Sequence, residues 1–126
     1  MNDSNNLELG IIGNCHSSAL ISKTGSIDWC CLPEFDSPSV FGKILDNNIG
    51  GTFQIICDKN YIIEQEYLKN TCILVTKFSS GKNIFEIHDF MPRYLKKDNK
   101  YHSPAEVVRY FKLISGKPKF KINYDP

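Results

Sequence analysis

The sequence is poor in arginine and contains no long apolar run. Only Arg93 and Arg109 are arginines, whereas thirteen residues are lysine, and the 15 basic residues are balanced by 14 acidic ones to give a net charge of +1. This balance excludes the concentrated basic field that nucleic-acid binding requires. The longest uninterrupted apolar runs, at residues 29–32 and 72–75, have four residues each, whereas a membrane-spanning helix needs about 20. We therefore expect neither a nucleic acid nor a membrane as a partner.

Signals of export are also scarce. The first nine residues lack a charged segment followed by an apolar one, so no signal peptide is expected. The five cysteines are an odd number, and Cys30 and Cys31 are adjacent, so that on a strand their side chains point to opposite faces. This pattern suits thiols buried in a reducing compartment better than a disulfide framework. We expect a cytoplasmic protein.

The composition is that of a globular domain, and its dominant pattern is alternation. With 126 residues, 41% of them apolar and 12% aromatic, the chain can build a real core as one domain or as part of a larger one. Period-two alternation predicts strands over residues 18–22, 26–32, 51–57, 61–68, 71–78, 83–91 and 119–124. The segment 71–78 is apolar on both faces, which is typical of a central strand. Gly25, in the short connection between the first two of these strands, is a hairpin signal. We expect an all-β protein, an antiparallel β-sandwich of about eight strands.

Two segments favour a helix at first sight. Ser37 and Pro38 have the residue types of an N-cap and a first helical position, and four apolar residues share one helical face after them. This predicts one short helix near residues 38–46. Residues 103–106 have the spacing of a capping box, but the residues that follow, 107–114, are rich in β-branched and aromatic types, so helix and strand remain equally supported there. The lysine-rich segment 93–103 is expected to be a surface loop.

Paired carboxylates are the first candidates for chemistry. Glycoside hydrolysis needs two carboxyl groups, and residues two apart on a strand share a face. The pairs Glu34/Asp36 and Glu64/Glu66 both have this spacing. For Glu64 and Glu66 a solvated sheet face is the simpler interpretation. Glu34 and Asp36 lie near Trp29 and Phe35, whose rings suit a sugar, although Asp36 could instead bond the backbone ahead of Ser37.

Other polar residues have simpler structural interpretations. Cys15-His16 and His88-Asp89 could be imagined as metal ligands, or a cysteine and a histidine as a nucleophile pair, but no spacing supports either, so neither a metal nor a cofactor is expected. Trp29 is most simply a core residue. Arg109 lies inside an apolar segment and would need a partner if buried; Asp89 or Glu106 could supply it.

Several motifs resemble a known family. They are GIIGNCHSSALI at residues 10–21, TGSIDWCCLP at 24–33, FDSPSVF at 35–41, DFMPR at 89–93 and Arg109 with Gly116 and Pro126. Together they resemble the trehalase-like N-terminal domain, which precedes the catalytic barrel in bacterial and archaeal proteins of glycoside hydrolase family 15, the glucoamylase and trehalase group. The resemblance extends over about residues 7–126. Glu34 stands where that family usually has an arginine or another non-acidic residue.

The resemblance implies a fold and a function. It implies a β-sandwich, with 107–114 as a strand, and an (α/α)6 barrel that carries the two catalytic glutamates and follows the domain. Residues 1–126 would then be a sandwich fragment without catalytic residues, whose partners are the barrel, in cis or in trans, and through it an α-glucan or trehalose-type saccharide. The alternative is a free-standing β-sandwich that binds a carbohydrate or a protein. In either case the expected contact residues are Trp29, Phe35, Asp36 and Ser37.

Open strand edges are expected if the sandwich is incomplete. Unpaired edges and an uncovered apolar face both favour self-association. The strand expected at 71–78, apolar on both faces, would be the first to associate if its neighbours were missing.

Overall fold

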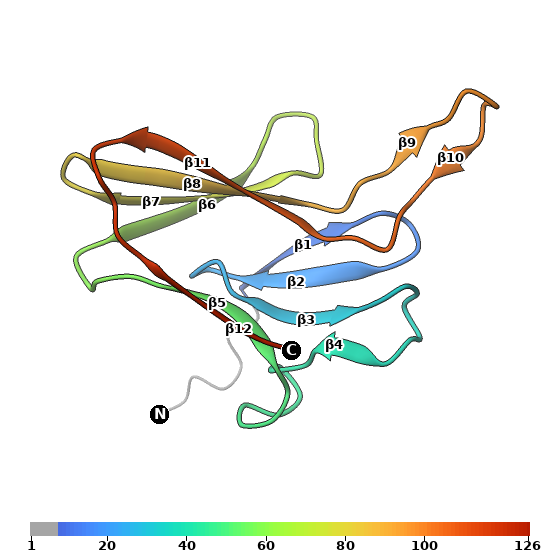
Figure 1. The fold of residues 1–126 in the computed structure, drawn as a ribbon, viewed down its shortest axis with the longest axis horizontal. Coiled ribbons are helices and arrows are strands. Elements are labelled where there is room, and N and C mark those ends of the chain that lie inside the picture. Colours follow the sequence, from blue (N-terminus) through green and yellow to red (C-terminus); the bar gives the residue numbers. More distant parts are fainter. Residues whose placement is uncertain (1–7) are drawn as a thin grey trace.

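The computed structural model describes residues 8–126, which form strands and no helix. One sheet has the order β1 (Leu9–Gly13), β2 (Ser18–Ser22), β3 (Ile27–Cys31), β5 (Thr52–Ile56), β12 (Lys121–Asp125), with β4 (Ser39–Phe41) paired to β3. The second has the order β11 (Val108–Ser115), β8 (Asn83–Phe90), β7 (Leu74–Ser80), β6 (Ile62–Tyr67). A short hairpin of β9 (Tyr94–Leu95) and β10 (Tyr101–His102) projects from the body (Figure 1). Every pairing is antiparallel, which confirms the predicted sandwich.

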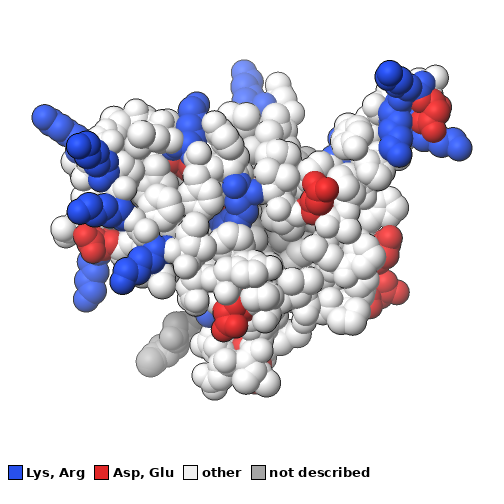
Figure 2. All heavy atoms as spheres, in the orientation of Figure 1, with Lys and Arg blue, Asp and Glu red and all other residues white. Residues whose placement is uncertain are grey.

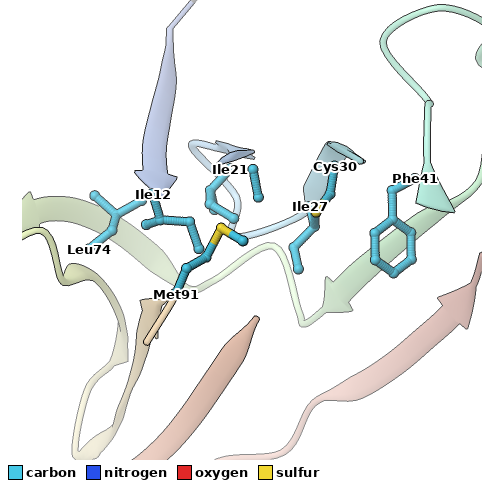
Figure 3. Packing of buried hydrophobic residues seen from close by; sticks show 8 residues of the cluster. Ile12, Ile21, Ile27, Cys30, Phe41, Leu74 and Met91 are labelled. Atoms are coloured by element: carbon cyan, nitrogen blue, oxygen red, sulfur yellow. The ribbon is translucent and has the colours of Figure 1, made fainter. Parts of the chain in front are cut away.

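The two sheets enclose the core between them. Around β1–β4 it contains a cluster of aliphatic side chains with Cys30 and the Phe41 ring, which also includes Leu74 and Met91 (Figure 3). A second cluster centres on Ile55, Phe78, Phe85 and Ile87. Its rings form a stack, with centroids 4.6 Å apart for Phe78 and Phe85 and 4.4 Å apart for Phe85 and Phe120. Residues far apart in the sequence thus meet in one apolar layer, which is the main favourable contribution to folding.

The strand β7 occupies the position that its two apolar faces predict. It lies between β6 and β8, and Leu74, Val75, Thr76 and Phe78 are buried. The expectation that this segment would be the first to associate depended on missing neighbours, and within residues 8–126 that condition is not met, because strands on both sides and the opposite sheet cover it. The exposed strand edges lie elsewhere.

The predicted helix near residues 38–46 does not form. Residues Ser39–Phe41 are instead strand β4, in which Phe41 pairs with Cys30 of β3. After Phe41 the chain turns: the Lys43 N–H donates to the Gly51 carbonyl at 3.1 Å and the Ile44 N–H to the Asp28 carbonyl at 3.1 Å. These two partners lie outside the segment, whereas the N–H groups of Leu45 and Asp46 both donate to the Gly42 carbonyl within it. The result is a turn anchored by tertiary hydrogen bonds and not a helical ladder. Leu45, expected on the apolar helical face, is 77% exposed.

Segments 107–114, for which helix and strand were equally supported, and 93–103, which was expected to be a loop, both contain strands. Residues Val108–Ser115 form β11, paired along their length with β8, so the β-branched and aromatic composition prevails over the capping-box spacing. The segment 93–103, expected to be a loop, contains the β9–β10 hairpin, in which Tyr101 pairs with Leu95 and His102 with Tyr94. The Arg93 guanidinium carbon lies 4.0 Å from the centre of the Tyr101 ring. This cation–π contact helps to hold the projecting hairpin together.

Trp29 is only partly buried and belongs to neither core cluster, so the expectation of a core tryptophan is wrong. The physical reason is a β-bulge between β2 and β3: Leu20 pairs with Trp29, but the next residue, Ile21, pairs with Ile27. The extra residue, Asp28, changes the alternation of inward and outward side chains. As a result Ile27 and Cys30 face the core, and Trp29 does not join them.

Candidate functional site

The loop between β3 and β4, residues 33–37, is a tight turn held by Ser37. The Glu34 N–H donates to the Ser37 hydroxyl at 3.1 Å, and the Ser37 N–H donates to the Glu34 carbonyl at 3.1 Å. The Leu32–Pro33 peptide bond is cis. Ser37 thus braces the turn from within, whereas its sequence context predicted the cap of a helix.

Phe35 and Asp36 form the outer side of this turn. Phe35 is 55% exposed and Asp36 is exposed. Within residues 8–126 no hydrogen bond to the Asp36 carboxylate is present, so the backbone-bracing role considered for Asp36 belongs to Ser37. No hydrogen bond or ring contact links Trp29 to either residue in the described part of the chain. The structure therefore brings Phe35, Asp36 and Ser37 into one turn and leaves Trp29 on the strand that leads to it.

Glu34 contacts the neighbouring turn between β1 and β2. Its Oε2 lies 3.4 Å from Nδ1 of His16, and both side chains are about half exposed. His16 is positioned by Asn14, whose Oδ1 accepts the N–H groups of His16 at 3.0 Å and Ser17 at 2.9 Å. The Ser17 hydroxyl in turn donates to the Cys31 carbonyl, just ahead of the 33–37 loop. The two turns are therefore connected by buried hydrogen bonds at one end of the sandwich.

The same end includes the base of the projecting hairpin. The Asn14 side-chain amide donates to the Pro104 carbonyl at 3.0 Å, and the Ser103 hydroxyl donates to the Asn14 carbonyl at 3.0 Å. Lysines gather on the projecting hairpin, at the place of β9–β10 in Figure 1 (Figure 2). The carboxylates of Glu34 and Asp36 thus lie at the same end of the molecule as a lysine-bearing hairpin.

A cavity of about 500 Å³ opens beside Asn14. Its walls come from the β1–β2 turn, the segment that leads into β7, and the end of β8 with the start of the hairpin, and its lining includes Cys15, Cys72, Met91, Arg93 and Tyr94. These segments are far apart in the sequence, and no local motif marks them as a group. Sequence reasoning therefore could not identify this cavity.

The carboxylates of the 33–37 loop are not enclosed. A general acid for glycoside cleavage is a carboxyl in an enclosed, partly apolar site. Glu34 and Asp36 are exposed instead. An exposed ring and a carboxylate with free acceptor oxygens can stack on a sugar or accept hydroxyl and guanidinium donors.

A deeply buried ion pair lies between the sheets. The side chains of Arg109 on β11 and Asp89 on β8 are 4% and 0% exposed. Arg109 Nε lies 2.7 Å from Asp89 Oδ1 and Nη2 lies 3.1 Å from Oδ2, a bidentate contact. This confirms Asp89, and not Glu106, as the partner of the arginine. Burial raises the pKa of Asp89, and the hydrogen bond and charge of Arg109, with the charge of His88, act in the opposite direction.

Arg109 also reaches across to the other sheet. Its Nη1 donates to the Phe53 carbonyl of β5 at 3.3 Å, and Nη2 donates to the carbonyl of Gly25 in the β2–β3 turn. Its guanidinium carbon lies 4.7 Å from the centre of the Phe53 ring. One side chain therefore connects β8, β11, β5 and the β2–β3 turn. The backbone acceptors could not be found from sequence, because carbonyl groups carry no sequence signal.

A second polar network supports the bulged strand β3. The Ser26 hydroxyl donates to Asp28 Oδ1 at 2.6 Å and lies 2.8 Å from the hydroxyl of Thr52, which lies 3.2 Å from the Ile27 carbonyl. Ser26 and Thr52 are buried. The sequence GSIDW at 25–29 thus contributes a turn glycine with φ +79° and two members of this network, Ser26 and Asp28, of which Asp28 is also the bulge residue. Its polar residues therefore stabilise the bulged strand.

The remaining candidates do not form a site. Glu64 and Glu66 are exposed on β6, and Glu64 lies opposite Lys77, as a solvated sheet face predicts. His88 Nε2 lies 3.0 Å from Glu86 Oε1, whereas His16 contacts Glu34, so the imagined pair of metal dipeptides is not brought together. Among residues 8–126 no group of three His, Cys, Asp or Glu side chains could hold a metal ion. In the same part of the chain no helix is long and apolar enough to cross a membrane.

Comparisons with known proteins agree on one group. The model of the family described as "Trehalase-like, N-terminal" matches residues 3–126. The chain is 38% identical over 122 residues to a protein named trehalase from Thermoplasma volcanium, covering 93% of this chain and 19% of that protein. It is 39% identical over 112 residues to a trehalase of Thermoplasma acidophilum, with 85% and 18% covered. A protein named trehalase 2 from Sulfolobus acidocaldarius is 42% identical over 86 residues, with 68% and 14% covered.

These matches cover only a small part of the relatives. The chain spans less than a fifth of the length of the curated proteins just described. No solved structure matches the fold significantly.

Proposed function

Because this chain belongs to the trehalase-like N-terminal family, we propose that it is the non-catalytic N-terminal module of an enzyme that hydrolyses trehalose or a related α-glucoside. In this proposal the enzyme is of the glycoside hydrolase family 15 type and acts with inversion. The catalytic pair of carboxyl groups belongs to an (α/α)6 barrel, in cis or in trans, and the sandwich packs against it. The proteins it resembles are named trehalases, and most of their length lies outside the matched region.

The observation that supports a non-catalytic role is the use of the acidic residues. Asp89 neutralises Arg109 inside the sandwich, and Asp28 belongs to the Ser26–Thr52 network. Glu34, Asp36, Glu64 and Glu66 are exposed. Hydrolysis with inversion requires an acid and a base held about 6.5–9.5 Å apart on either side of an enclosed sugar. The described carboxylates that are buried are already used to stabilise the fold.

We place the contact with the rest of the enzyme at the 33–37 loop. Phe35 presents an exposed ring and Asp36 an exposed carboxylate, and the turn that carries them is held by Ser37 and supported by the His16 turn. A rigid loop at the end of a sheet presents side chains at low entropic cost. Such side chains suit the wall of a neighbouring domain or the outer hydroxyls of a bound sugar.

The test is a chimera in which residues 8–126 replace the matching segment of the Thermoplasma volcanium trehalase. In that background Asp36→Asn and Phe35→Ala should lower kcat/KM for trehalose by about tenfold, a loss of about 1.4 kcal/mol of transition-state stabilisation, with little change in Tm. Ser37→Ala is the matched control, because it loosens the turn and should lower Tm as well. If Asp36→Asn and Phe35→Ala leave kcat/KM unchanged, the loop is not the contact.

The alternative function, a free-standing carbohydrate-binding module, is separated by calorimetry on the chain itself. Under our proposal the isolated chain neither hydrolyses trehalose nor binds it measurably, because one loop buries little of a sugar. Saturable binding of trehalose that is lost in Phe35→Ala would favour the alternative. We also propose the cytoplasm as the compartment, supported by five cysteines that are all unpaired.

A further inference from the structure

The outer faces of the two sheets carry opposite kinds of side chain. On the second sheet a row of residues in register crosses the four strands, and its charges alternate: Glu64 of β6, Lys77 of β7, Glu86 of β8 and Lys112 of β11. Each of these residues is exposed or partly exposed. Opposite charges on neighbouring strands are favourable pairs, so this face is suited to water.

The corresponding row on the first sheet is apolar. Ile11 of β1 pairs with Leu20 of β2, and Leu20 pairs with Trp29 of β3, so the three side chains share one face. It is the outer face, because Ala19 and Ile21, on either side of Leu20, both belong to the core. Ile11 is 55% exposed, and Leu20 and Trp29 are partly buried. We call these three residues the apolar row.

The residue types around the apolar row indicate that this face is covered in the folded enzyme. Strands β1 and β2 contain no charged residue, and the one in β3, Asp28, is held at the bulge by Ser26 and Thr52. Strands that are apolar on both faces are typical of sheets buried on both sides. Within residues 8–126 the indole N–H of Trp29 makes no hydrogen bond, so a donor is left for whatever lies over it.

We propose that a helix of the catalytic part of the enzyme packs on the apolar row. This inference rests on the proposed function, in which that part is an (α/α)6 barrel and therefore helical. In the trehalases of the two Thermoplasma species most of the length lies outside the matched region. A helix on the apolar face of a sheet is one of the common layer arrangements of proteins.

The dimensions of the apolar row suit a single helix. Neighbouring strands lie about 4.8 Å apart, so that a row over three strands spans about 10 Å between its outer Cα atoms. A helix with its side chains is about 10–12 Å in diameter. The expected helix has an apolar stripe toward Ile11 and Leu20 and a carboxylate, amide or hydroxyl acceptor for the Trp29 indole. Because β3 leads from Trp29 into the 33–37 loop, the same domain would contact both.

Protection of a thiol from labelling tests the proposal. Ile11→Cys places a thiol at the most exposed position of the apolar row and keeps the backbone N–H and carbonyl that bond the Tyr67 hydroxyl. The variant is compared in the isolated chain and in the chimera with the Thermoplasma volcanium trehalase. Labelling by a maleimide, measured at this position by peptide mass spectrometry, should be about tenfold or more slower in the chimera, because the thiol reacts only when the helix opens away from the sheet.

Lys77→Cys is the matched control. It places a thiol in the middle of the charged row on the other sheet and should be labelled at the same rate in the isolated chain and in the chimera. A second variant, Ile11→Asp, gives an independent measurement. It should lower the Tm of the chimera and leave that of the isolated chain nearly unchanged, because only in the chimera would the carboxylate be buried.

The outcomes separate this inference from the proposed function. Equal labelling of Ile11→Cys in the isolated chain and in an active chimera would overturn the helix contact and leave the enzyme module intact. Slow labelling already in the isolated chain would also overturn it, and a dependence on protein concentration would identify a second copy as the cover. Slow labelling only in a chimera that does not hydrolyse trehalose would support the contact and contradict the proposed function. Fast labelling in an inactive chimera would contradict both.

Discussion

Removal of the Arg109 guanidinium should destabilise the sandwich more than almost any other single side-chain change. In Arg109→Met the aliphatic part of the side chain is kept, but the Asp89 carboxylate, 0% exposed, loses its counter-ion and both hydrogen bonds. The carbonyl groups of Phe53 and Gly25 lose a donor at the same time. The substitution therefore leaves one buried charge and two backbone acceptors without this partner.

The expected cost is about 3–5 kcal/mol, the range for breaking a buried ion pair from one side. A domain of this size has a total unfolding free energy of about 5–15 kcal/mol, so the substitution should remove a large fraction of it. Replacement of both partners, Asp89→Leu with Arg109→Met, removes the unpaired charge. It should cost only about 1–3 kcal/mol, mainly through the carbonyl groups left without a donor.

Urea unfolding followed by the fluorescence of Trp29 and by far-UV circular dichroism measures these differences. With a slope of about 1–3 kcal/mol per molar urea, Arg109→Met should lower the midpoint by about 2 M. Lys112→Met on the same strand removes an exposed positive charge and should shift the stability little, by about 0.5 kcal/mol or less. It is the control for loss of charge alone.

The double-mutant cycle gives the decisive comparison. If the pair is coupled as the geometry indicates, the double variant is more stable than Arg109→Met alone. A double variant whose loss equals the sum of the two single losses would contradict this coupling, because the two side chains would then act independently. A loss below about 1 kcal/mol for Arg109→Met would contradict the buried placement itself.

Three further predictions concern single residues. Gly25→Ala should cost about 1–3 kcal/mol of stability, because φ is +79° and the new Cβ would lie 3.1 Å from Phe78 Cζ. Gly81→Ala, with φ +60° and no atom within 4 Å of the new Cβ, should cost about 1 kcal/mol. Equal losses of the two variants in thermal unfolding would contradict the crowding of the Gly25 Cβ against Phe78. Burial, with a smaller effect of Cys31, raises the pKa of Cys30 from 9.0 to about 11, so the stability that this neutral thiol provides below pH 9 is lost as the pH rises through 11. The loss should reach about 3 kcal/mol. The urea midpoint should therefore fall less between pH 9 and pH 11 in Cys30→Ala than in the wild-type chain. Equal pH profiles of the two proteins would refute this role of Cys30. Cys15 and Cys72, both exposed, should react with a maleimide in the native chain, while Cys30 should react only after unfolding, as peptide mass spectrometry can show.

Local sequence patterns were sufficient to predict most of the strands. Alternation identifies β5, β6 and β8 within one or two residues of their bounds, and the two apolar faces of the segment 71–78 correctly indicate the central strand β7. Such patterns work because a strand with one buried face must alternate with period two, whatever its neighbours are. The resemblance carried by residues 10–41 and 89–93 likewise identifies the family, which the comparisons confirm.

Backbone hydrogen bonds to distant residues decided what the local patterns got wrong. Ser37 and Pro38 have the residue types of a helix start, but the N–H groups after them bond to Asp28 and Gly51, and no helix forms. The bulge at Asp28 keeps Trp29 out of the core although its apolar neighbours predict burial. In both places a tertiary partner outweighs a local preference of about 1 kcal/mol or less.

The candidate site divides in the same way. Local patterns were enough to place Phe35 and Asp36 between a strand that ends before Pro33 and the segment that follows, and to show that Arg109 would need a partner if buried. The folded chain was needed to show that Asp89 is that partner, that Arg109 also bonds Gly25 and Phe53, and that Glu34 meets His16. The physical reason is that burial and hydrogen-bond partners are properties of neighbours in space, and a local sequence window contains only neighbours along the chain.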